Sequence, residues 1–354
     1  MIYYNQFINF IKGGLFLMKA VKKIMMGLSA MAICASMLAT QVFATSEANL
    51  ARHNSIGLHS QTEFSSWYAG GESSDSGFMD TEISVNHFSG NVTINTKVTQ
   101  GSFLELEFTY NSLDSVGSQE LGEHFATNFN RTLTPMSEDV YEYRDTTGTR
   151  YHFEQEQGML RDEKGRGLAF DQEGYPYKIQ DSLYQLIYFR EDGKFVKQIE
   201  SHHGGMSYIT TDATYNEDGT LNSVANDNYQ YDFSYGSNDR IQKAYFYDIN
   251  VGDNEATELE CVYDQAADKL TGIRLDGMEN IFAYDDEGEY IVNIGDFSIE
   301  YDSQGRATKV TQYDEDGNVI DEESYLYGNN QTAIIDEEGE ITLEVFNPDG
   351  TLVK

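Results

Sequence analysis

A short turn motif recurs through the second half of this 354-residue chain and constrains the fold more than any other feature. In each copy an aromatic residue, usually followed by Asp or Asn, precedes a turn glycine or acid, and aliphatic residues then follow at alternating positions. A repeat of this kind indicates an array of like supersecondary units. The nine copies begin at Phe170, Phe189, Tyr215, Tyr235, Tyr263, Tyr284, Tyr301, Tyr313 and Phe346.

The residues of one copy predict a β-hairpin. The aromatic residue ends a strand on its buried face, and Asp or Asn with Gly forms a tight turn that tolerates positive φ. The alternating aliphatic residues are typical of the returning strand. One hairpin cannot bury both of its faces, whereas stacked hairpins can. We therefore predict an all-β protein whose repetitive antiparallel hairpins form a long curled sheet or an open partial shell.

The region before the repeats also alternates with period two. Apolar residues alternate at Ile83 and Val85, at Val92 and Ile94, and again through 103–110. Such spacing predicts half-buried strands, and no stretch sustains a helical period. We expect an N-terminal β-region at 83–165 and the repeat array at 166–354.

The N-terminus has the order of a secretory signal peptide. Lys19, Lys22 and Lys23 precede an apolar run that ends near Ala44, so 18–44 is the predicted signal and 1–17 an upstream start extension. The run is too short for a confident membrane span. Residues 45–82 are rich in Ser and Gly and are predicted to be a linker or arm. The protein is therefore expected to be secreted, outside the cell or associated with its surface.

The charge of the chain argues against two classes of partner. After removal of 1–44 the chain holds 19 basic and 59 acidic side chains, a formal charge of −40. Such a field repels phosphate backbones and anionic lipid, so we expect no nucleic-acid binding and no membrane insertion. Cys261 is the one cysteine left in that mature chain, which rules out an intramolecular disulfide.

The repeat resembles that of the Rhs/YD-repeat family, whose unit reads Tyr-Asp-x-x-Gly-Arg-Leu. The segment 301–306 (YDSQGR) is the nearest copy, and 86–92, 110–112 and 143–153 resemble the family's N-terminal β-region. The resemblance covers roughly 83–354 and implies a sheet that curls into a shell. Long members continue into a core motif and a variable C-terminal effector. Neither occurs before Lys354, so toxin activity is not implied, and we expect too few hairpins to close a shell.

Two sets of residues are candidate sites. Trp67 and Tyr68 could stack on a sugar, although packing of this aromatic pair on the main body is the favoured interpretation. Asp314, Asp316 and Asp321 belong to the densest acidic cluster. Its sixth position is not the glycine of an EF-hand loop, so a weak Ca²⁺ site is the one cofactor left open.

Two other reactive residue types carry no predicted site. Adjacent residues on a strand point to opposite faces, so His202 and His203 are not expected to bind one metal ion together. Cys261 lies in a strand-like stretch and is predicted to be a buried apolar residue.

No catalytic residue is predicted. The leading hypothesis is a non-enzymatic exported binding or scaffold protein, whose surface serves an extracellular glycan, a cell-wall component or a protein partner. One alternative is an orphan fragment of an Rhs-type toxin shell that assembles with other chains. The other is a secreted glycan-active enzyme, although most carboxylates lie at turn tips rather than across a cleft.

Overall fold

The computed structural model describes residues 61–68, 78–99, 104–137, 139–156, 159–162, 166–170, 176–180, 185–202, 207–250, 256–264, 266–275, 278–314, 316–348 and 350–353. The predicted signal peptide and start extension lie outside these residues. No helix within them is long and apolar enough to cross a membrane.

The first sheet, called the N-terminal sheet here, is an antiparallel meander of five strands in chain order. Its second, third and fourth strands carry large side chains that are fully buried. The strands are β1 (Gln61–Tyr68), β2 (Phe78–Asn86), β3 (Val92–Thr99), β4 (Leu106–Asn111) and β5 (Phe125–Thr127).

The second sheet, called the repeat sheet here, continues from β6 to β26, and each strand pairs antiparallel with the next in sequence. Its strands are β6 (Thr132–Ser137), β7 (Val140–Arg144), β8 (Arg150–Glu156), β9 (Met159–Arg161), β10 (Gly167–Phe170), β11 (Pro176–Gln180), β12 (Gln185–Phe189), β13 (Phe195–His202), β14 (Ser207–Tyr215), β15 (Leu221–Ala225), β16 (Tyr229–Tyr235), β17 (Ile241–Asp248), β18 (Thr257–Asp264), β19 (Lys269–Leu275), β20 (Met278–Tyr284), β21 (Ile291–Ile294), β22 (Phe297–Tyr301), β23 (Ala307–Tyr313), β24 (Val319–Tyr327), β25 (Gln331–Ile335) and β26 (Ile341–Val345).

The repeat sheet is long, curled and open. A single bridge between Thr132 and Lys194 links the start of β6 to the turn between β12 and β13, so the first hairpins fold back on one another. Among the described strands, no ladder register joins β26 to β6. The predicted all-β architecture of a curled sheet is thus confirmed.

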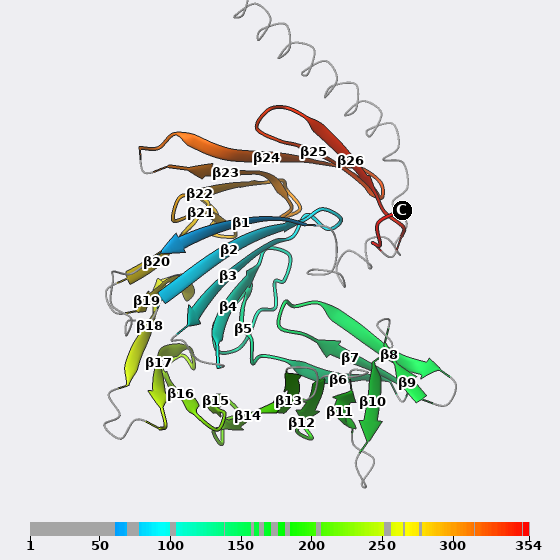
Figure 1. Cartoon of the computed structure of the whole chain (residues 1–354), viewed down its shortest axis with the longest axis vertical. Coiled ribbons are helices and arrows are strands. Elements are labelled where there is room, and N and C mark those ends of the chain that lie inside the picture. The colour runs from blue at the N-terminus through cyan, green and yellow to red at the C-terminus, as the bar shows by residue number, and fades with distance from the viewer. Residues whose placement is uncertain are drawn as a thin grey trace, which may run out of the picture.

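The repeat sheet curls around the N-terminal sheet. Figure 1 shows β1–β5 in the centre, with β6–β15 below, β16–β20 to one side and β21–β26 above. Buried Asn280 of β20 donates hydrogen bonds to the hydroxyls of Thr81 and Thr96, at 2.8 and 3.0 Å. On β4, Tyr110 accepts a hydrogen bond from the amide of Ile291, at 3.3 Å. The concave face of the repeats therefore covers protein.

The turn of one repeat explains why the motif carries Asp and Gly. The amide of Asp302 donates to the carbonyl of Arg306 at 2.9 Å, and the amide of Gly305 donates to the carbonyl of Asp302 at 3.0 Å. The Asp302 carboxylate accepts from the amide of Gln304 at 2.8 Å. Gly305 has φ +74°, which favours glycine, and the strand register shifts at Tyr301.

Four tyrosines of the motif each tie a hairpin to the one before it. The hydroxyl of Tyr284 donates to the carbonyl of Leu270 at 2.7 Å, near the start of the preceding return strand. Burial raises the pKa of Tyr284, which keeps the hydroxyl protonated as a donor. The same bond forms from Tyr215 to Phe195, from Tyr235 to Leu221 and from Tyr301 to Ile291.

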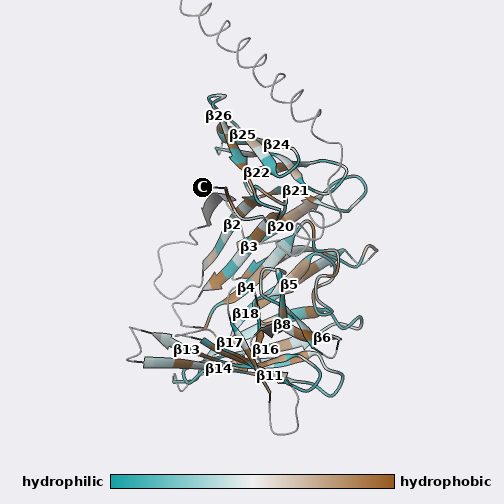
Figure 2. Cartoon of the chain, turned by 90° about the vertical axis from the view of Figure 1, so that its right-hand side faces the viewer, coloured by the Kyte–Doolittle hydropathy of each residue, from teal (hydrophilic) through white to brown (hydrophobic). Residues whose placement is uncertain are grey.

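Two features differ from the sequence-based expectation. Strand β1 lies in the segment 45–82 that was predicted to be a linker or arm. The two sheets divide between β5 and β6, inside the expected N-terminal β-region 83–165, so β6–β9 continue the repeat sheet. Figure 2 shows the common pattern of both sheets, with apolar residues along the strands and hydrophilic residues at the hairpin turns.

The structure also contains hairpins that the motif search missed. The amide of Asp162 bonds to the carbonyl of Arg166 at 3.2 Å, and Asp336 bonds to Glu340 in the same way at 3.2 Å. Neither Asp follows an aromatic residue, so a search that begins with the aromatic position passes over both. The turn chemistry of Asp and Gly therefore defines the repeat more generally than the tyrosine does.

Candidate binding site

A cavity of about 350 Å³ opens where the two sheets meet. Its walls come from the loop after β4, the segment 128–131 that joins the sheets, strands β6–β8, the turn between β12 and β13, and the end of β14. We call this cavity the seam pocket and the segment 128–131 the strap. Its charged lining residues are Arg131, Arg144, Arg150, Lys194, Glu120 and Glu142.

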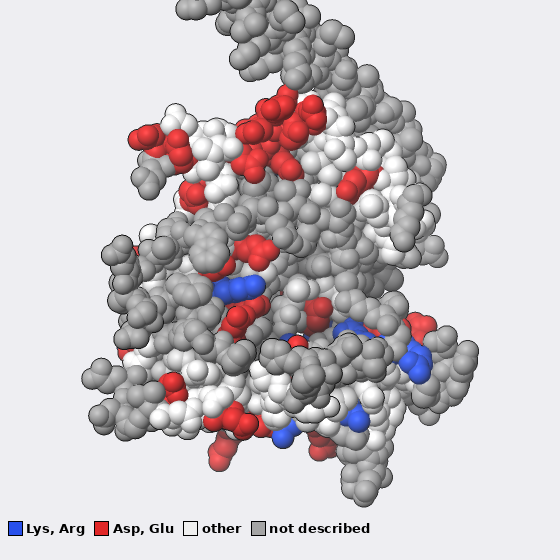
Figure 3. All heavy atoms as spheres, viewed as in Figure 1, with Lys and Arg blue, Asp and Glu red and all other residues white. Residues whose placement is uncertain are grey.

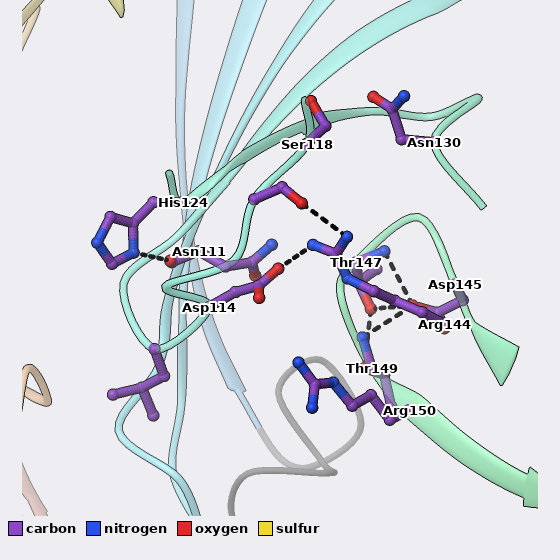
Figure 4. A network of polar contacts seen from close by, with 12 residues as sticks. Asn111, Asp114, Ser118, His124, Asn130, Arg144, Asp145, Thr147, Thr149 and Arg150 are labelled. Atoms are coloured by element: carbon purple, nitrogen blue, oxygen red, sulfur yellow. Dashed lines mark hydrogen bonds and ion pairs between the residues drawn. The ribbon is translucent and has the colours of Figure 1, made fainter. Parts of the chain in front are cut away.

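Arg144 joins the two sheets at the floor of the seam pocket. It lies at the end of β7 and is only 9% exposed. Its guanidinium pairs with the buried Asp114 carboxylate and donates to the carbonyl of Gly117 at 2.8 Å, both in the loop after β4. Figure 4 shows this contact and, beside it, Asp145 holding the β7–β8 turn. Breaking a buried ion pair leaves an uncompensated charge, so the floor is firmly held.

The β7–β8 turn that presents Arg144 and Arg150 is a repeat turn. The carboxylate of Asp145 accepts hydrogen bonds from the amides of Thr147 and Thr149, at 2.9 and 3.1 Å. Gly148 has φ +81°. The same Asp and Gly chemistry that builds the array therefore fixes the two arginines on either side of this turn.

The strap and the start of β6, which follows it, are held against the β12–β13 turn. The amide of Leu133 donates to the carbonyl of Gly193 at 2.9 Å. A Cβ atom at Gly193 would lie 2.2 Å from the carbonyl oxygen of Leu133, so this close approach needs glycine. Arg131 donates to the side-chain oxygen of Gln198 at 2.7 Å and lies over the ring of Phe195. The strap thus places Arg131 at the pocket wall.

Lys194 and Tyr215 form the opposite wall. The Lys194 ammonium donates to the carbonyl of Gly219 and lies 5.5 Å from the centre of the Tyr215 ring. Arg190 lies over the same ring at 5.0 Å, and the Tyr215 hydroxyl donates to the carbonyl of Phe195 at 2.6 Å. These contacts orient an aromatic face and a cation toward one cavity.

Arg150 is more exposed than Arg144. Its side chain is 32% exposed, and its Nε lies 4.0 Å from the Glu142 carboxylate. Glu142 also contacts the Nε2 atom of His152, at 3.2 Å. The contact between Arg150 and Glu142 is long, and both residues lie at the rim of the pocket. Arg150 can therefore turn toward a ligand more readily than Arg144, which is buried.

The carboxyl of Glu120 lines the pocket beside the strap. Burial raises its pKa, because desolvation disfavours the charged form, and nearby Lys194 and the amide of Asn130 partly offset this. The amide of Asn130 donates to Glu120 at 3.1 Å. Glu120 therefore ionises less readily than an exposed glutamate, although several cations line the same pocket.

Positive charge is unevenly distributed over the chain. Residues 131–194 hold nine basic and thirteen acidic side chains, whereas 281–354 hold three and nineteen. Figure 3 shows the visible basic side chains in the middle and lower part of the molecule, beside acidic ones, while only acidic ones appear on the upper lobe. The seam pocket lies in the part with the more balanced charge.

The residues predicted as sites do not meet at the seam pocket. Trp67 and Tyr68 lie on β1, opposite Asp80 and Met79, and their side chains are outside the structural description. No three or more His, Cys, Asp or Glu residues in the described ranges are arranged to hold a metal ion. The structure therefore does not gather Asp314, Asp316 and Asp321 into a calcium site.

Asp314 instead closes its own hairpin turn. Its carboxylate accepts from the amides of Asp316 and Asn318, at 3.0 and 2.8 Å, and from the Asn318 side chain at 2.9 Å. These hydrogen bonds from Asn318 lower the pKa of Asp314. Asp321 lies on β24 opposite Gln312, beyond the turn. The dense acidic sequence thus reflects turn formation.

Cys261 is buried and unpaired, as the sequence predicted. Burial raises its pKa, which disfavours the reactive thiolate. His202 ends β13, and His203 lies outside the described residues. Cys261 is not among the residues that line the seam pocket.

Sequence reasoning missed the seam pocket because its residues are far apart along the chain. Glu120, Arg131, Arg144 and Lys194 belong to four different segments, which the curl brings together. A signal was present nonetheless. Nine of the 23 basic residues fall within 131–194, an enrichment that stands out in so acidic a chain.

The comparisons with known proteins give no family assignment. No family model matches the chain, and no curated protein matches it. The chain is similar to a chain in the crystal structure of TcdB2-TccC3-Cdc42, with 10% identity and a TM-score of 0.35 over 82% of this chain. It spans 19% of that chain.

A second solved structure, a porin-like protein from Bacteroides uniformis ATCC 8492, is 11% identical with a TM-score of 0.19. The match covers 56% of this chain and 94% of that one. At these TM-scores neither likeness carries an argument about function.

Proposed function

We propose that this chain is an exported, non-enzymatic binding protein of the YD-repeat type, which holds its ligand at the seam pocket. It acts outside the cell or at the cell surface, on a glycan, a cell-wall component or a protein partner. The observation that carries the proposal is the pocket itself. It has the volume of a small-molecule site, and its cations and aromatic faces are held by both sheets.

The fold supports a scaffold role. The N-terminal sheet lies inside the curl and hydrogen-bonds to its concave face through Asn280 and Ile291. The places left for a ligand are then the outer surface and the junctions between the sheets. The seam pocket, of about 350 Å³, is larger than the cavity of about 170 Å³ that Leu121, Arg240 and Tyr284 help to line.

A glycan array probed with the purified protein tests the proposal, together with a variant that fills the pocket. Thr134 of β6 lines the pocket and is exposed, so Thr134→Trp adds a large side chain without disturbing a core. Met136 lies two residues further along the same strand, is 59% exposed and does not line the pocket. Met136→Trp is therefore the matched control. We expect binding that Thr134→Trp abolishes and Met136→Trp preserves.

Two outcomes would overturn the proposal. Binding that Thr134→Trp and Met136→Trp leave equally intact would place the ligand elsewhere. Hydrolysis of a bound glycan, lost on replacement of a single carboxylate, would make the protein an enzyme.

A second candidate function is assembly with other YD-repeat chains into a larger shell. The observation that favours it is the exposure of apolar residues on the last strand, where Leu343 and Val345 are 52% and 43% exposed. Light scattering distinguishes the two. A monomer at micromolar concentration contradicts self-assembly, whereas an oligomer that Leu343→Lys dissociates supports it.

A further inference from the structure

The chemistry of the seam pocket identifies the ligand class, an inference that rests on the proposed binding function. Four basic side chains line it, against two acidic ones. Arg131 and Lys194 are held by neutral partners, the amide of Gln198 and the carbonyl of Gly219. Neither has an ion-pair partner within 4.0 Å in the described part of the chain. Their charges are thus available to a ligand.

Three of the arginines also carry unused donors. The Nε atoms of Arg131, Arg144 and Arg150 are buried and have no hydrogen-bond partner among the described residues. A buried donor without an acceptor costs about 1–3 kcal/mol. These Nε atoms are buried behind the pocket wall, and an anion bound in the cavity would offset the positive charge of the three guanidinium groups.

The donors are positioned before any ligand arrives. Arg144 is fixed by Asp114 and by the carbonyl of Gly117, and Arg131 lies 5.4 Å from the centre of the Phe195 ring. Because these side chains are already ordered, little conformational entropy is lost when they bind. Guanidinium groups match the geometry of a carboxylate or phosphate better than ammonium groups do.

The rest of the lining suits a hydroxylated body. Phe129 and Tyr215 contribute aromatic edges to the lining, and Asn130, Ser118 and Glu120 provide groups that exchange hydrogen bonds with hydroxyls. The volume, about 350 Å³, suits one or two sugar rings, so a short oligosaccharide would bind through its terminal units. An apolar ligand would leave these polar groups unpaired.

We propose that the seam pocket binds an acidic saccharide. The carboxylate or phosphate of the sugar accepts hydrogen bonds from Arg150 and Arg131, and its ring lies between Phe129 and Tyr215. Arg144 serves mainly to hold the floor, because Asp114 already balances its charge. Arg150 admits the anion at the rim, since its own contact with Glu142 is long.

Calorimetric titration of the purified protein tests this ligand class. The probes are a galacturonic acid trimer, the matched neutral galactose trimer and glucose 6-phosphate. The acidic trimer tests a carboxylate, and the sugar phosphate tests a phosphate. The variant Arg150→Gln removes the rim charge, and Arg274→Gln, on β19 with a side chain 46% exposed, is the control away from the pocket. A thermal melt of each variant establishes that it is folded.

We expect at least one acidic probe to bind at least tenfold more tightly than the neutral trimer. Arg150→Gln should weaken that binding about tenfold, the loss of one charge-assisted hydrogen bond, whereas Arg274→Gln leaves it unchanged. Equal binding of the neutral trimer, blocked by Thr134→Trp, would overturn the acidic ligand class and leave the proposed function standing. Binding of no probe would overturn the class too, and the glycan array then decides the proposed function separately.

Discussion

The two sheets use the same antiparallel pairing but differ in how they are covered. In the N-terminal sheet, five of the six residues of β4 are buried. In the repeat sheet, no side chain of β26 is buried, and β14 buries only Ala213. A repeat hairpin is therefore covered on one face only. The strands of the N-terminal sheet are covered because the repeat sheet curls around them. We infer that stability is concentrated where the sheets meet.

The largest effect should come from the contact between the sheets. Phe125 of β5 is 2% exposed and packs against Tyr110 and against Phe282 of β20, each at 5.3 Å between ring centres. Phe125→Ala should lower the free energy of unfolding by about 3–5 kcal/mol. Phe170→Ala, on β10 of the repeat sheet with the ring 39% exposed, should cost much less. Denaturant unfolding measures both, and equal losses would show that the junction has no special role.

Replacing one glycine at the junction and one away from it separates the cost of backbone strain from the cost of a steric clash between the sheets. Gly90 has φ +76°, and a Cβ atom there would lie 2.5 Å from Cβ of Arg306 on the repeat sheet. Gly317 has a similar φ of +79° and open space around it. Gly317→Ala should cost about 1 kcal/mol from strain alone, and Gly90→Ala clearly more, because the sheets must separate. If chemical denaturation gives the same cost for both, the Gly90 contact does not constrain the sheets.

The tyrosine that links neighbouring hairpins should contribute less. Tyr284→Phe removes the hydrogen bond to the carbonyl of Leu270 while keeping the ring, and should cost about 0.5–1.5 kcal/mol. Tyr208→Phe is the control, since Tyr208 is 67% exposed. The difference between their unfolding midpoints in urea checks the prediction, and a Tyr284→Phe variant as stable as the control would refute the link.

The smallest effect concerns pH at the seam pocket. Burial raises the pKa of the Glu120 carboxyl in the folded state, so its ionisation destabilises the fold at neutral pH, and this penalty is relieved as pH falls through the raised pKa. Glu120→Gln should therefore be more stable than the parent protein at pH 7. Below the ordinary Glu pKa of about 4.3 the difference should vanish. Stability curves of both proteins measured across pH 4–8 would contradict this if they ran parallel.

The fold could be predicted from the sequence because its rules are local. Asp302 and Gly305 make their turn within five residues, and the alternation around Val92 and Ile94 specifies strands without reference to the rest of the chain. The same local rule accounts for Asp314, which was predicted as a Ca²⁺ ligand and whose carboxylate accepts hydrogen bonds within its own hairpin turn.

The candidate site could not be predicted because it depends on the curl. Arg144 meets Asp114 only after β6–β8 fold under the loop that follows β4, thirty residues apart along the chain. Lys194 reaches the strap only because β12 and β13 return to it. Neither of these two contacts can be recognised from the spacing of residues along the chain. The enrichment of arginine within 131–194 marks the region but not the pocket.

Hydrogen exchange with and without an acidic saccharide tests the central claim most directly, that the junction of the two sheets is the binding site. The account predicts that saturating ligand slows exchange in the strap and at 190–195 and 142–151, with the β23–β24 and β25–β26 turns unchanged. Protection confined to those acidic turns, or absent from the strap, would contradict it.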